Sequence, residues 1–180
     1  CYMNATIQCF SHTIKLSNYF LNPKNSHLFT QKGSLTKEYY EVIKHLWLRK
    51  YNNNKNSYPP TNLKNIISEK DPLFQGIYAN DSKDLITLLL QTLHNELNKP
   101  LNDNNIIQNN DTFTQYNRQS VIDNFIKNFQ KNERSIISDI FYGVYEIHTK
   151  CQLCNQKALS INFPNPNILY NFQTFTFLIF

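Results

Sequence analysis

The chain has 180 residues, of which 41% are hydrophobic, 14% aromatic and 17% charged, so it has room for one domain or part of a larger one and is too apolar to be disordered throughout. No apolar run reaches the roughly 18 residues that a bilayer span requires, so we expect no membrane partner. The net charge of +5 comes from scattered Lys and Arg residues, which argues against a nucleic-acid partner. Four cysteines are too few for a disulfide framework, so we expect a reducing compartment, cytoplasmic or nuclear or both.

Apolar residues recur at intervals of three and four in the first part of the chain, as they do on the buried face of a helix. This period predicts a helix over residues 1–16 and a helix over 37–50 that ends in a basic turn. A shorter helix is predicted over 61–69, directly after Pro60. Residues 71–80 contain a proline and a glycine and are expected to form a turn-rich connector.

The clearest helix is predicted from Asp81, a good N-cap residue, to Leu97, and Pro100 stops it. Residues 101–119 are polar and rich in Asn, so they predict a linker or an insertion. The helical period then returns over residues 119–131.

From Ser135 onward the chain is rich in β-branched and aromatic residues that partly alternate with polar ones. This pattern predicts that the tail is mainly strands. Cys151 and Cys154 are expected at the tip of a hairpin, where the C-x-x-C spacing lets both thiolates face one zinc ion.

Cys1 comes directly before the first predicted helix. A thiol at a helix N-terminus faces unpaired backbone amides and the positive end of the helix dipole, and both favour the thiolate. Cys1 is therefore a candidate nucleophile, with an ordinary cysteine at a chain end as the alternative. Cys9, in the second turn, is expected to be a buried, small apolar residue.

Three stretches, in this order, resemble sequence motifs of the ubiquitin-specific proteases. They are CYMNATIQCF at 1–10, which is similar to the family's Cys box; FQG at 74–76 with DSKDL at 81–85 and LHNEL at 93–97; and FYG at 141–143, leading to the C-x-x-C at 151–154. The resemblance implies an α+β fold, with a papain-like cysteine peptidase fragment over residues 1–180. Residues 1–100 would be the helical thumb, 101–119 the linker or insertion, and 120–180 a helix followed by the β-rich start of a zinc-ribbon fingers subdomain.

The same resemblance implies a deubiquitinase that cuts after the C-terminal glycine of ubiquitin, so ubiquitin or ubiquitinated proteins are the expected partners. Cys1 would be the catalytic nucleophile, Asp81 would bind the basic tail of ubiquitin, and Cys151 with Cys154 would be zinc ligands. No cofactor is expected for catalysis. The zinc would be structural, and its other two ligands would lie beyond Phe180.

The sequence departs from the family pattern at several points. Ala79 and Asn80 stand where the family has two Gln residues. None of the five His residues lies in a motif like that of the family's general base, and the oxyanion-hole Asn that precedes the nucleophile is also missing. The residues that would act with Cys1 are expected outside this stretch, so residues 1–180 alone should be inactive.

Other functions fit parts of the sequence. An inactive relative that serves as a ubiquitin-binding module would account for the altered Gln-Gln positions. An amidohydrolase that uses the α-amino group of an N-terminal Cys as its base would account for Cys1, although such enzymes expose their nucleophile on a strand edge. A zinc-dependent nucleic-acid ribbon is the remaining alternative for the C-x-x-C.

Overall fold

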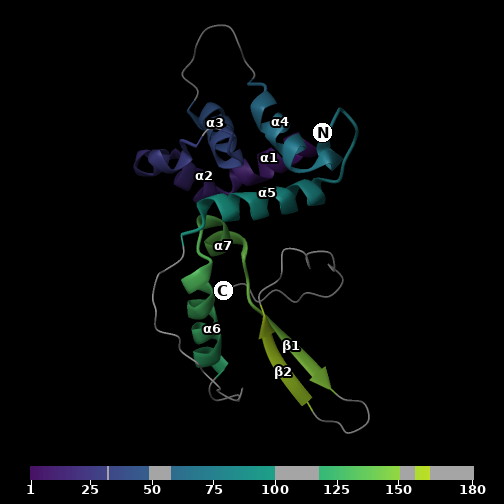
Figure 1. The fold of residues 1–180 in the computed structure, drawn as a ribbon. Coiled ribbons are helices and arrows are strands. Elements are labelled where there is room, and N and C mark those ends of the chain that lie inside the picture. Colours follow the sequence, from purple (N-terminus) through teal and green to yellow (C-terminus); the bar gives the residue numbers. More distant parts are fainter. Residues whose placement is uncertain (32, 49–57, 100–117, 151–156, 163–180) are drawn as a thin grey trace. The chain divides into compact units, whose positions relative to one another are not determined.

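A computed structural model describes residues 1–31, 33–48, 58–99, 118–150 and 157–162 (Figure 1). The chain divides into two compact units. The first comprises Cys1–Asn98 and Ser135–Ile140, and the second comprises the described parts of Lys99–Arg134 and Phe141–Phe180. Within the ranges given above, every helix is too short or too polar to cross a lipid bilayer.

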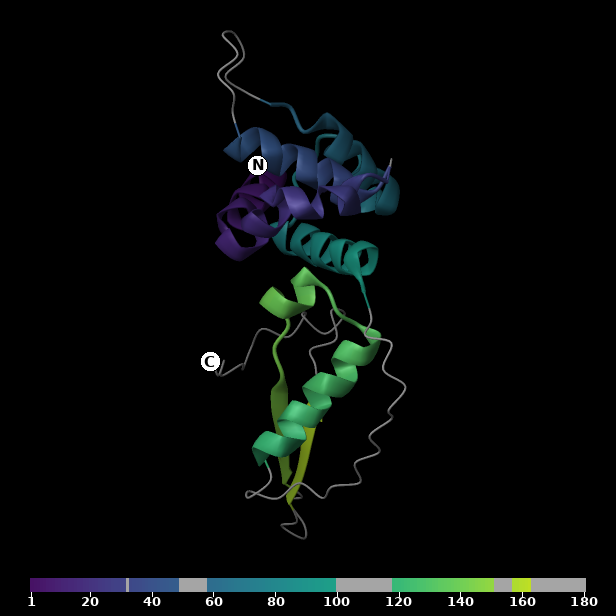
Figure 2. The same cartoon turned by 90° about the vertical axis from the view of Figure 1, so that its left-hand side faces the viewer.

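The first unit is a layered group of helices. Helix α5 packs against α1 and α3, and α3 also packs against α2 and α4. Figures 1 and 2 show α5 running along one side of the other helices. The elements are α1 (Tyr2–His12), α2 (Ile14–Leu21), the 3-10 helix η1 (Pro23–Phe29), α3 (Leu35–Trp47), α4 (Thr61–Lys70), the 3-10 helix η2 (Pro72–Phe74), α5 (Ser82–Leu97) and the greater part of α7 (Ile136–Phe141).

The long helices of this unit bury most of the apolar residues predicted to share a helix face, because residues three and four apart lie on the same face. On α3, Leu46 and Trp47 fit the same spacing but are exposed. In α5 the buried apolar stripe consists of Leu85, Leu89, Leu93 and Leu97. Aromatic side chains pack together between α2, η1 and α3. The centroid of the Phe20 ring lies 4.8 Å from that of the Phe29 ring and 5.0 Å from that of the Tyr39 ring. Burial of these stripes holds the unit together.

The predicted helix over residues 1–16 is in fact two helices. Thr13, with φ −74° and ψ 88°, leaves the helical region between α1 and α2. The Thr13 hydroxyl donates to the carbonyl of Cys9, and the Thr13 amide donates to the carbonyl of Phe10. These two bonds satisfy carbonyls at the end of α1. Periodicity did not reveal the break, because apolar residues continue at similar spacing on both sides of it.

The prediction that strands begin at Ser135 is wrong, because Ile136–Phe141 is helix α7. The Ser135 hydroxyl accepts hydrogen bonds from the amides of Ile137 and Ser138, which is the arrangement of an N-cap. Ile137 is fully buried. Capping and burial together outweigh the strand preference of the β-branched residues, since that preference depends strongly on context.

The second unit contains α6 (Arg118–Asn132) and the strands β1 (Tyr145–Lys150) and β2 (Lys157–Asn162). The two strands pair antiparallel, from Tyr145 opposite Asn162 to Lys150 opposite Lys157. The Lys99 amide donates to the Arg134 carbonyl over 2.8 Å, so Arg134 lies directly beside Lys99 in this unit. The expected linker lies mostly outside the described residues.

The expected α+β fold with a β-rich zinc-ribbon start is wrong for the part of the chain that the structure describes. That part is mainly helical, and its strands are the single pair β1 and β2. The expectation relied on strand propensity across residues 135–180, of which the first stretch forms α7. Residues 163–180, for which further strands were predicted, lie outside the described residues.

Candidate active site

Cys1 is the N-cap residue of α1. Its side chain is exposed and makes no capping hydrogen bond to the helix, while its carbonyl accepts a bond of 3.0 Å from the Ala5 amide. The thiol is thus open to solvent at the end of a helix whose first amides lack intrahelical partners. This placement suits a nucleophile, because the positive helix end favours thiolate.

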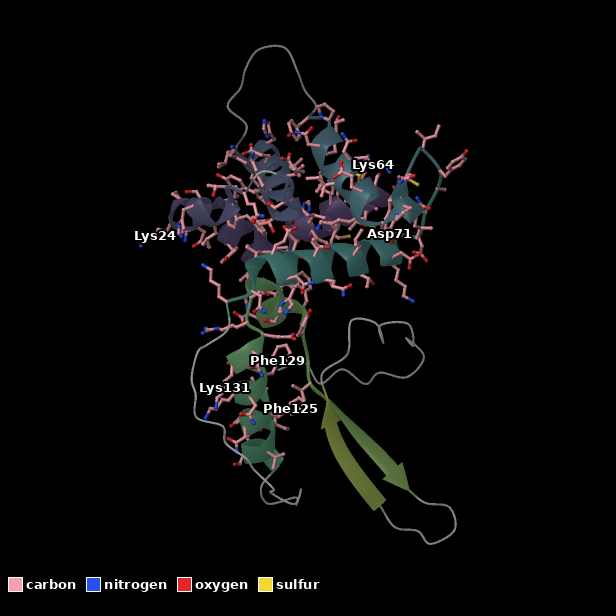
Figure 3. All side chains as sticks on the ribbon, viewed as in Figure 1. Lys24, Lys64, Asp71, Phe125, Phe129 and Lys131 are labelled. Carbon is pink, nitrogen blue, oxygen red and sulfur yellow. The ribbon has the colours of Figure 1, made fainter. Side chains whose placement is uncertain are left out.

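The residue next to Cys1 is tied to two other elements. The ring of Tyr2 stacks on that of Phe74 in η2, with centroids 5.8 Å apart. The Tyr2 hydroxyl accepts a hydrogen bond of 3.1 Å from Nζ of Lys64 on α4, and the same Nζ donates to the Phe74 carbonyl. One turn further along α4, the Ser68 hydroxyl donates to this carbonyl over 2.8 Å. Figure 3 labels Lys64 on α4.

The loop from η2 to α5 is strongly exposed. Gly76 adopts a φ of +70°, a left-handed conformation that favours glycine, and turns the chain after η2. The side chains that follow point away from the core: Ile77 is 100% exposed and Tyr78 is 79% exposed. Because Phe74 contacts Tyr2, this loop begins beside the N-terminal end of α1.

Asp81 ends this loop as the N-cap residue of α5. Its Oδ1 accepts a hydrogen bond of 2.9 Å from the Lys83 amide, and the exposed side chain leaves its second oxygen able to meet a ligand. In Figure 1, the N-terminus and the start of α5 lie at the same end of the first unit. The structure therefore brings Cys1 and Asp81 to one end of the helices.

Three His residues of the first unit lie in settings that do not suit a base for Cys1. His12 is at the far end of α1, about 16 Å along the helix axis. His45, near the end of α3, stacks on Tyr58 with ring centroids 3.9 Å apart. His94 is buried, and its Nδ1 lies 2.7 Å from the Ser135 hydroxyl.

The remaining cysteines are Cys9, on α1, and the predicted zinc ligands Cys151 and Cys154. Cys9 is exposed, so the prediction that it is buried is wrong: it lies on the face of α1 opposite Met3, Ile7 and Phe10. Cys151 and Cys154 lie outside the described residues, between the paired ends of β1 and β2. Among the described residues, no three His, Cys, Asp or Glu side chains are grouped to hold a metal ion.

Lys64 and Phe74 were not predicted as site residues. The pattern of α4 gives Lys64 no distinction, because a Lys on the polar side of an amphipathic helix is ordinary. The hydrogen bonds of Lys64 form because α1 and η2 meet beside α4. The spacing of apolar residues along the sequence does not predict this tertiary contact. A signal was present in Phe74, which lies in the FQG stretch that resembles the family, although no role was attached to it.

Comparison with known proteins settles the family. A sequence model described as ubiquitin carboxyl-terminal hydrolase matches residues 1–177. The chain belongs to this family. The resemblance to ubiquitin-specific proteases seen in the sequence motifs is thereby confirmed.

Individual relatives carry the same description. The chain is 32% identical over 169 residues to human ubiquitin carboxyl-terminal hydrolase 15, covering 90% of this chain and 16% of that protein. It is 27% identical over 175 residues to human ubiquitin carboxyl-terminal hydrolase 32, covering 94% of this chain and 10% of that protein. It is 28% identical over 167 residues to the probable ubiquitin carboxyl-terminal hydrolase 1 of Schizosaccharomyces pombe, covering 90% of this chain and 20% of that protein. The chain thus spans a fifth or less of these relatives.

Proposed function

We propose that the complete protein is a cysteine deubiquitinase and that residues 1–180 supply its nucleophile and part of its ubiquitin-binding surface. The observation that carries the proposal is the position of Cys1. Its exposed thiol sits at the N-terminus of α1, inside the region that matches the family. The names of the relatives indicate hydrolysis at the carboxyl end of ubiquitin, and a helix-end thiolate suits attack on that carbonyl.

In the proposed reaction, a His base takes the proton of the Cys1 thiol, and the thiolate attacks the carbonyl carbon of the last glycine of ubiquitin. The amine of the substrate leaves with a proton from the His, so that a thioester joins ubiquitin to Cys1. Water then hydrolyses the thioester. Backbone amides at the N-terminus of α1 contribute to holding the oxyanion in both steps.

The His base is proposed to come from outside residues 1–180. His12 lies at the far end of α1, and His45 stacks on an aromatic ring. His94 is buried, with Nδ1 in contact with the Ser135 hydroxyl. Without a base and with an incomplete oxyanion hole, residues 1–180 alone should show no useful turnover. Losing one oxyanion donor costs roughly 10²–10³ in rate in comparable hydrolases, and losing the base costs more.

Asp81 is proposed to bind the basic tail of ubiquitin. The carboxylate is exposed and lies at the same end of the first unit as Cys1. Its role as the N-cap of α5 fixes the direction of the side chain, because Oδ1 is held by the Lys83 amide. An Arg of the substrate tail could then pair with the other oxygen.

Cys151 and Cys154 are proposed to be two ligands of a structural zinc site. Support comes from their spacing and from the register of the hairpin, which places Lys150 opposite Lys157 and so brings the ends of the Cys-bearing segment together. The ion would stabilise this end of the hairpin and take no part in the chemistry.

A catalytically inactive, ubiquitin-binding relative is the second candidate function. It is favoured by Ala79 and Asn80, which replace the two Gln residues of the family pattern. The Nδ2 atom of Asn80 is buried and has no hydrogen-bond partner among the described residues, so this position is less well satisfied than most buried amides. Such a protein would bind ubiquitin at Asp81 without cutting it.

One experiment separates the two candidates. The full-length protein is treated with a ubiquitin probe that carries an electrophile at its C-terminus, and adducts are mapped by mass spectrometry. An enzyme should form an adduct on Cys1 that is lost in Cys1→Ser and kept in Cys9→Ser. Cys9 is a matched control, because it is also exposed but lies in the second turn of the helix. An adduct that survives in Cys1→Ser would remove the proposed nucleophile, and ubiquitin binding without any adduct would favour the inactive relative.

A further inference from the structure

The Cys1 side chain makes no capping hydrogen bond to α1, and none of the described residues is seen to fix its position by another bond. What holds the thiol in place is therefore the backbone of the first helical turn, and that turn is anchored by Tyr2. Catalysis is sensitive to such anchoring, because a misplacement of 1 Å can lower a rate by about 100-fold.

Lys64 is the residue that anchors Tyr2 by a polar contact. Its Nζ donates to the Tyr2 hydroxyl at 3.1 Å and to the Phe74 carbonyl. It also lies 5.8 Å from the centre of the Tyr2 ring, where the cation is attracted to the aromatic face. A single ammonium group thus joins α1, α4 and the end of η2.

Besides Lys64, the Phe74 carbonyl accepts a hydrogen bond from another side chain. Among the described contacts, Lys64 is the one hydrogen-bond donor to the Tyr2 hydroxyl. The Ser68 hydroxyl donates to the carbonyl over 2.8 Å, so η2 stays bonded to α4 if Lys64 is removed. The Tyr2 contact would be lost. Removal of the Lys64 amino group should therefore loosen the start of α1 and leave the position of η2 largely intact.

We infer that Lys64 is a positioning residue for Cys1: by joining the Tyr2 hydroxyl to the Phe74 carbonyl, it sets where the thiol lies relative to the loop that leads to Asp81. Lys64 does not touch the substrate in this role. The inference rests on the proposed function in that it names a residue on which the reactivity of Cys1 depends.

The test uses the full-length protein with four substitutions. Lys64→Met keeps a long unbranched side chain and removes the donor, and Lys64→Arg keeps a donor. Tyr2→Phe removes the acceptor and keeps the ring that stacks on Phe74. Lys24→Met is the matched control, because Lys24 is an exposed Lys of the same unit, in η1 (Figure 3).

Two readouts are taken. The first is kcat and KM on a fluorogenic ubiquitin substrate, with kcat expressed per active site titrated by the electrophilic probe so that loss of folded protein does not count. We expect Lys64→Met to lower kcat by roughly 10- to 100-fold with little change in KM. Tyr2→Phe should lower kcat in the same way, the double variant should be no worse than either single one, and Lys64→Arg should recover most of the loss.

The second readout does not need ubiquitin. The rate of alkylation of Cys1 by iodoacetamide is measured relative to that of Cys9, and Lys64→Met should lower this ratio by roughly two- to fivefold, the range that an interaction at a helix end is worth. If the unsubstituted protein does not cut ubiquitin, the proposed function fails and the alkylation ratio still decides the inference. The inference is overturned if Lys64→Met and Tyr2→Phe match Lys24→Met in both readouts, or if their effects on kcat simply multiply.

Discussion

Glu96, near the end of α5, caps α3 from 60 residues away: its Oε2 accepts a hydrogen bond of 2.8 Å from the Thr36 amide. Its Oε1 accepts a second bond of 3.2 Å from the Leu35 amide, and Nζ of Lys70 lies 3.4 Å from the same oxygen. A carboxylate at this end of a helix satisfies amides without intrahelical partners and meets the positive end of the dipole. This contact fastens α5 to the start of α3.

Replacing this carboxylate should destabilise the first unit. Glu96→Gln keeps one carbonyl oxygen but loses the charge and one of the two bonds, so we expect a loss of about 1–2 kcal/mol in the free energy of unfolding. Urea denaturation followed by circular dichroism measures it. The control is Glu69→Gln, an exposed position on α4, which should change stability by less than about 0.5 kcal/mol. Equal effects for the two variants would contradict the capping role.

Tyr39→Phe should stabilise the protein. Tyr39 is fully buried on α3, and its hydroxyl has no hydrogen-bond partner among the described residues. Leaving such a group unsatisfied costs about 1–3 kcal/mol, so its removal should raise the free energy of unfolding by about 1 kcal/mol. The same denaturation experiment applies, with Tyr40→Phe as a half-buried control on the next position of the helix. A destabilising Tyr39→Phe would show that the hydroxyl is satisfied.

Tyr39 should also make the protein sensitive to alkali. Burial raises the pKa of Tyr39 far above its ordinary value of 10.0. Above about pH 10 the tyrosine ionises in the unfolded chain but not in the folded one, so the unfolded state binds fewer protons and stability falls by up to about 1.4 kcal/mol per pH unit. Below pH 10 the contribution is fully present. Stability measured from pH 8 to 11 should decline less steeply in Tyr39→Phe than in the unsubstituted protein, and parallel curves would refute the assignment.

Ser135→Ala should unfold α7 and weaken its attachment to α5. The Ser135 hydroxyl accepts from the amides of Ile137 and Ser138, which leaves its own proton to donate to Nδ1 of His94. We expect a loss of about 1–3 kcal/mol, with faster hydrogen exchange at the two amides. Ser135→Thr retains the hydroxyl and should preserve protection. Unchanged exchange in Ser135→Ala would exclude the N-cap role.

Asp81→Asn should weaken ubiquitin binding and leave the stability of the protein nearly unchanged. Asn is as good an N-cap as Asp, so α5 should keep its bond to the Lys83 amide and the free energy of unfolding should change by less than about 1 kcal/mol. Loss of the charge should raise KM for a ubiquitin substrate by roughly tenfold or more, because a charged hydrogen bond is worth about 1.5–3 kcal/mol.

Asp71→Asn is the control for Asp81→Asn. Asp71 caps η2 in the same way, with Oδ1 accepting from the Leu73 amide at 2.9 Å, and it is labelled in Figure 3. The Asp71→Asn substitution should leave KM for the ubiquitin substrate unchanged. A similar rise in KM for both variants would mean that net charge, rather than the position of Asp81, affects binding.

Much of the first unit could be predicted from local pattern. The helices that became α3, α4 and α5 were predicted because each carries one apolar stripe, and Asp81 was recognised as the cap of α5. The position of Cys1 at the start of a helix followed from the same period. The break at Thr13 and the helix α7 were missed, because each depends on side-chain bonds to backbone that do not change the spacing of apolar residues.

By itself, the sequence determined which faces of the helices are buried, where most of these helices begin and which family the motifs resemble. These properties depend on residues that are close in the sequence. The α-helix places residues three and four apart on one face, so the spacing of apolar residues predicts which face is buried. Only the tertiary structure decided that Glu96 caps α3 and that Lys64 joins Tyr2 to Phe74. Such contacts join residues that are far apart in the chain, and they exist because packing of the apolar stripes brings particular polar atoms within hydrogen-bonding distance.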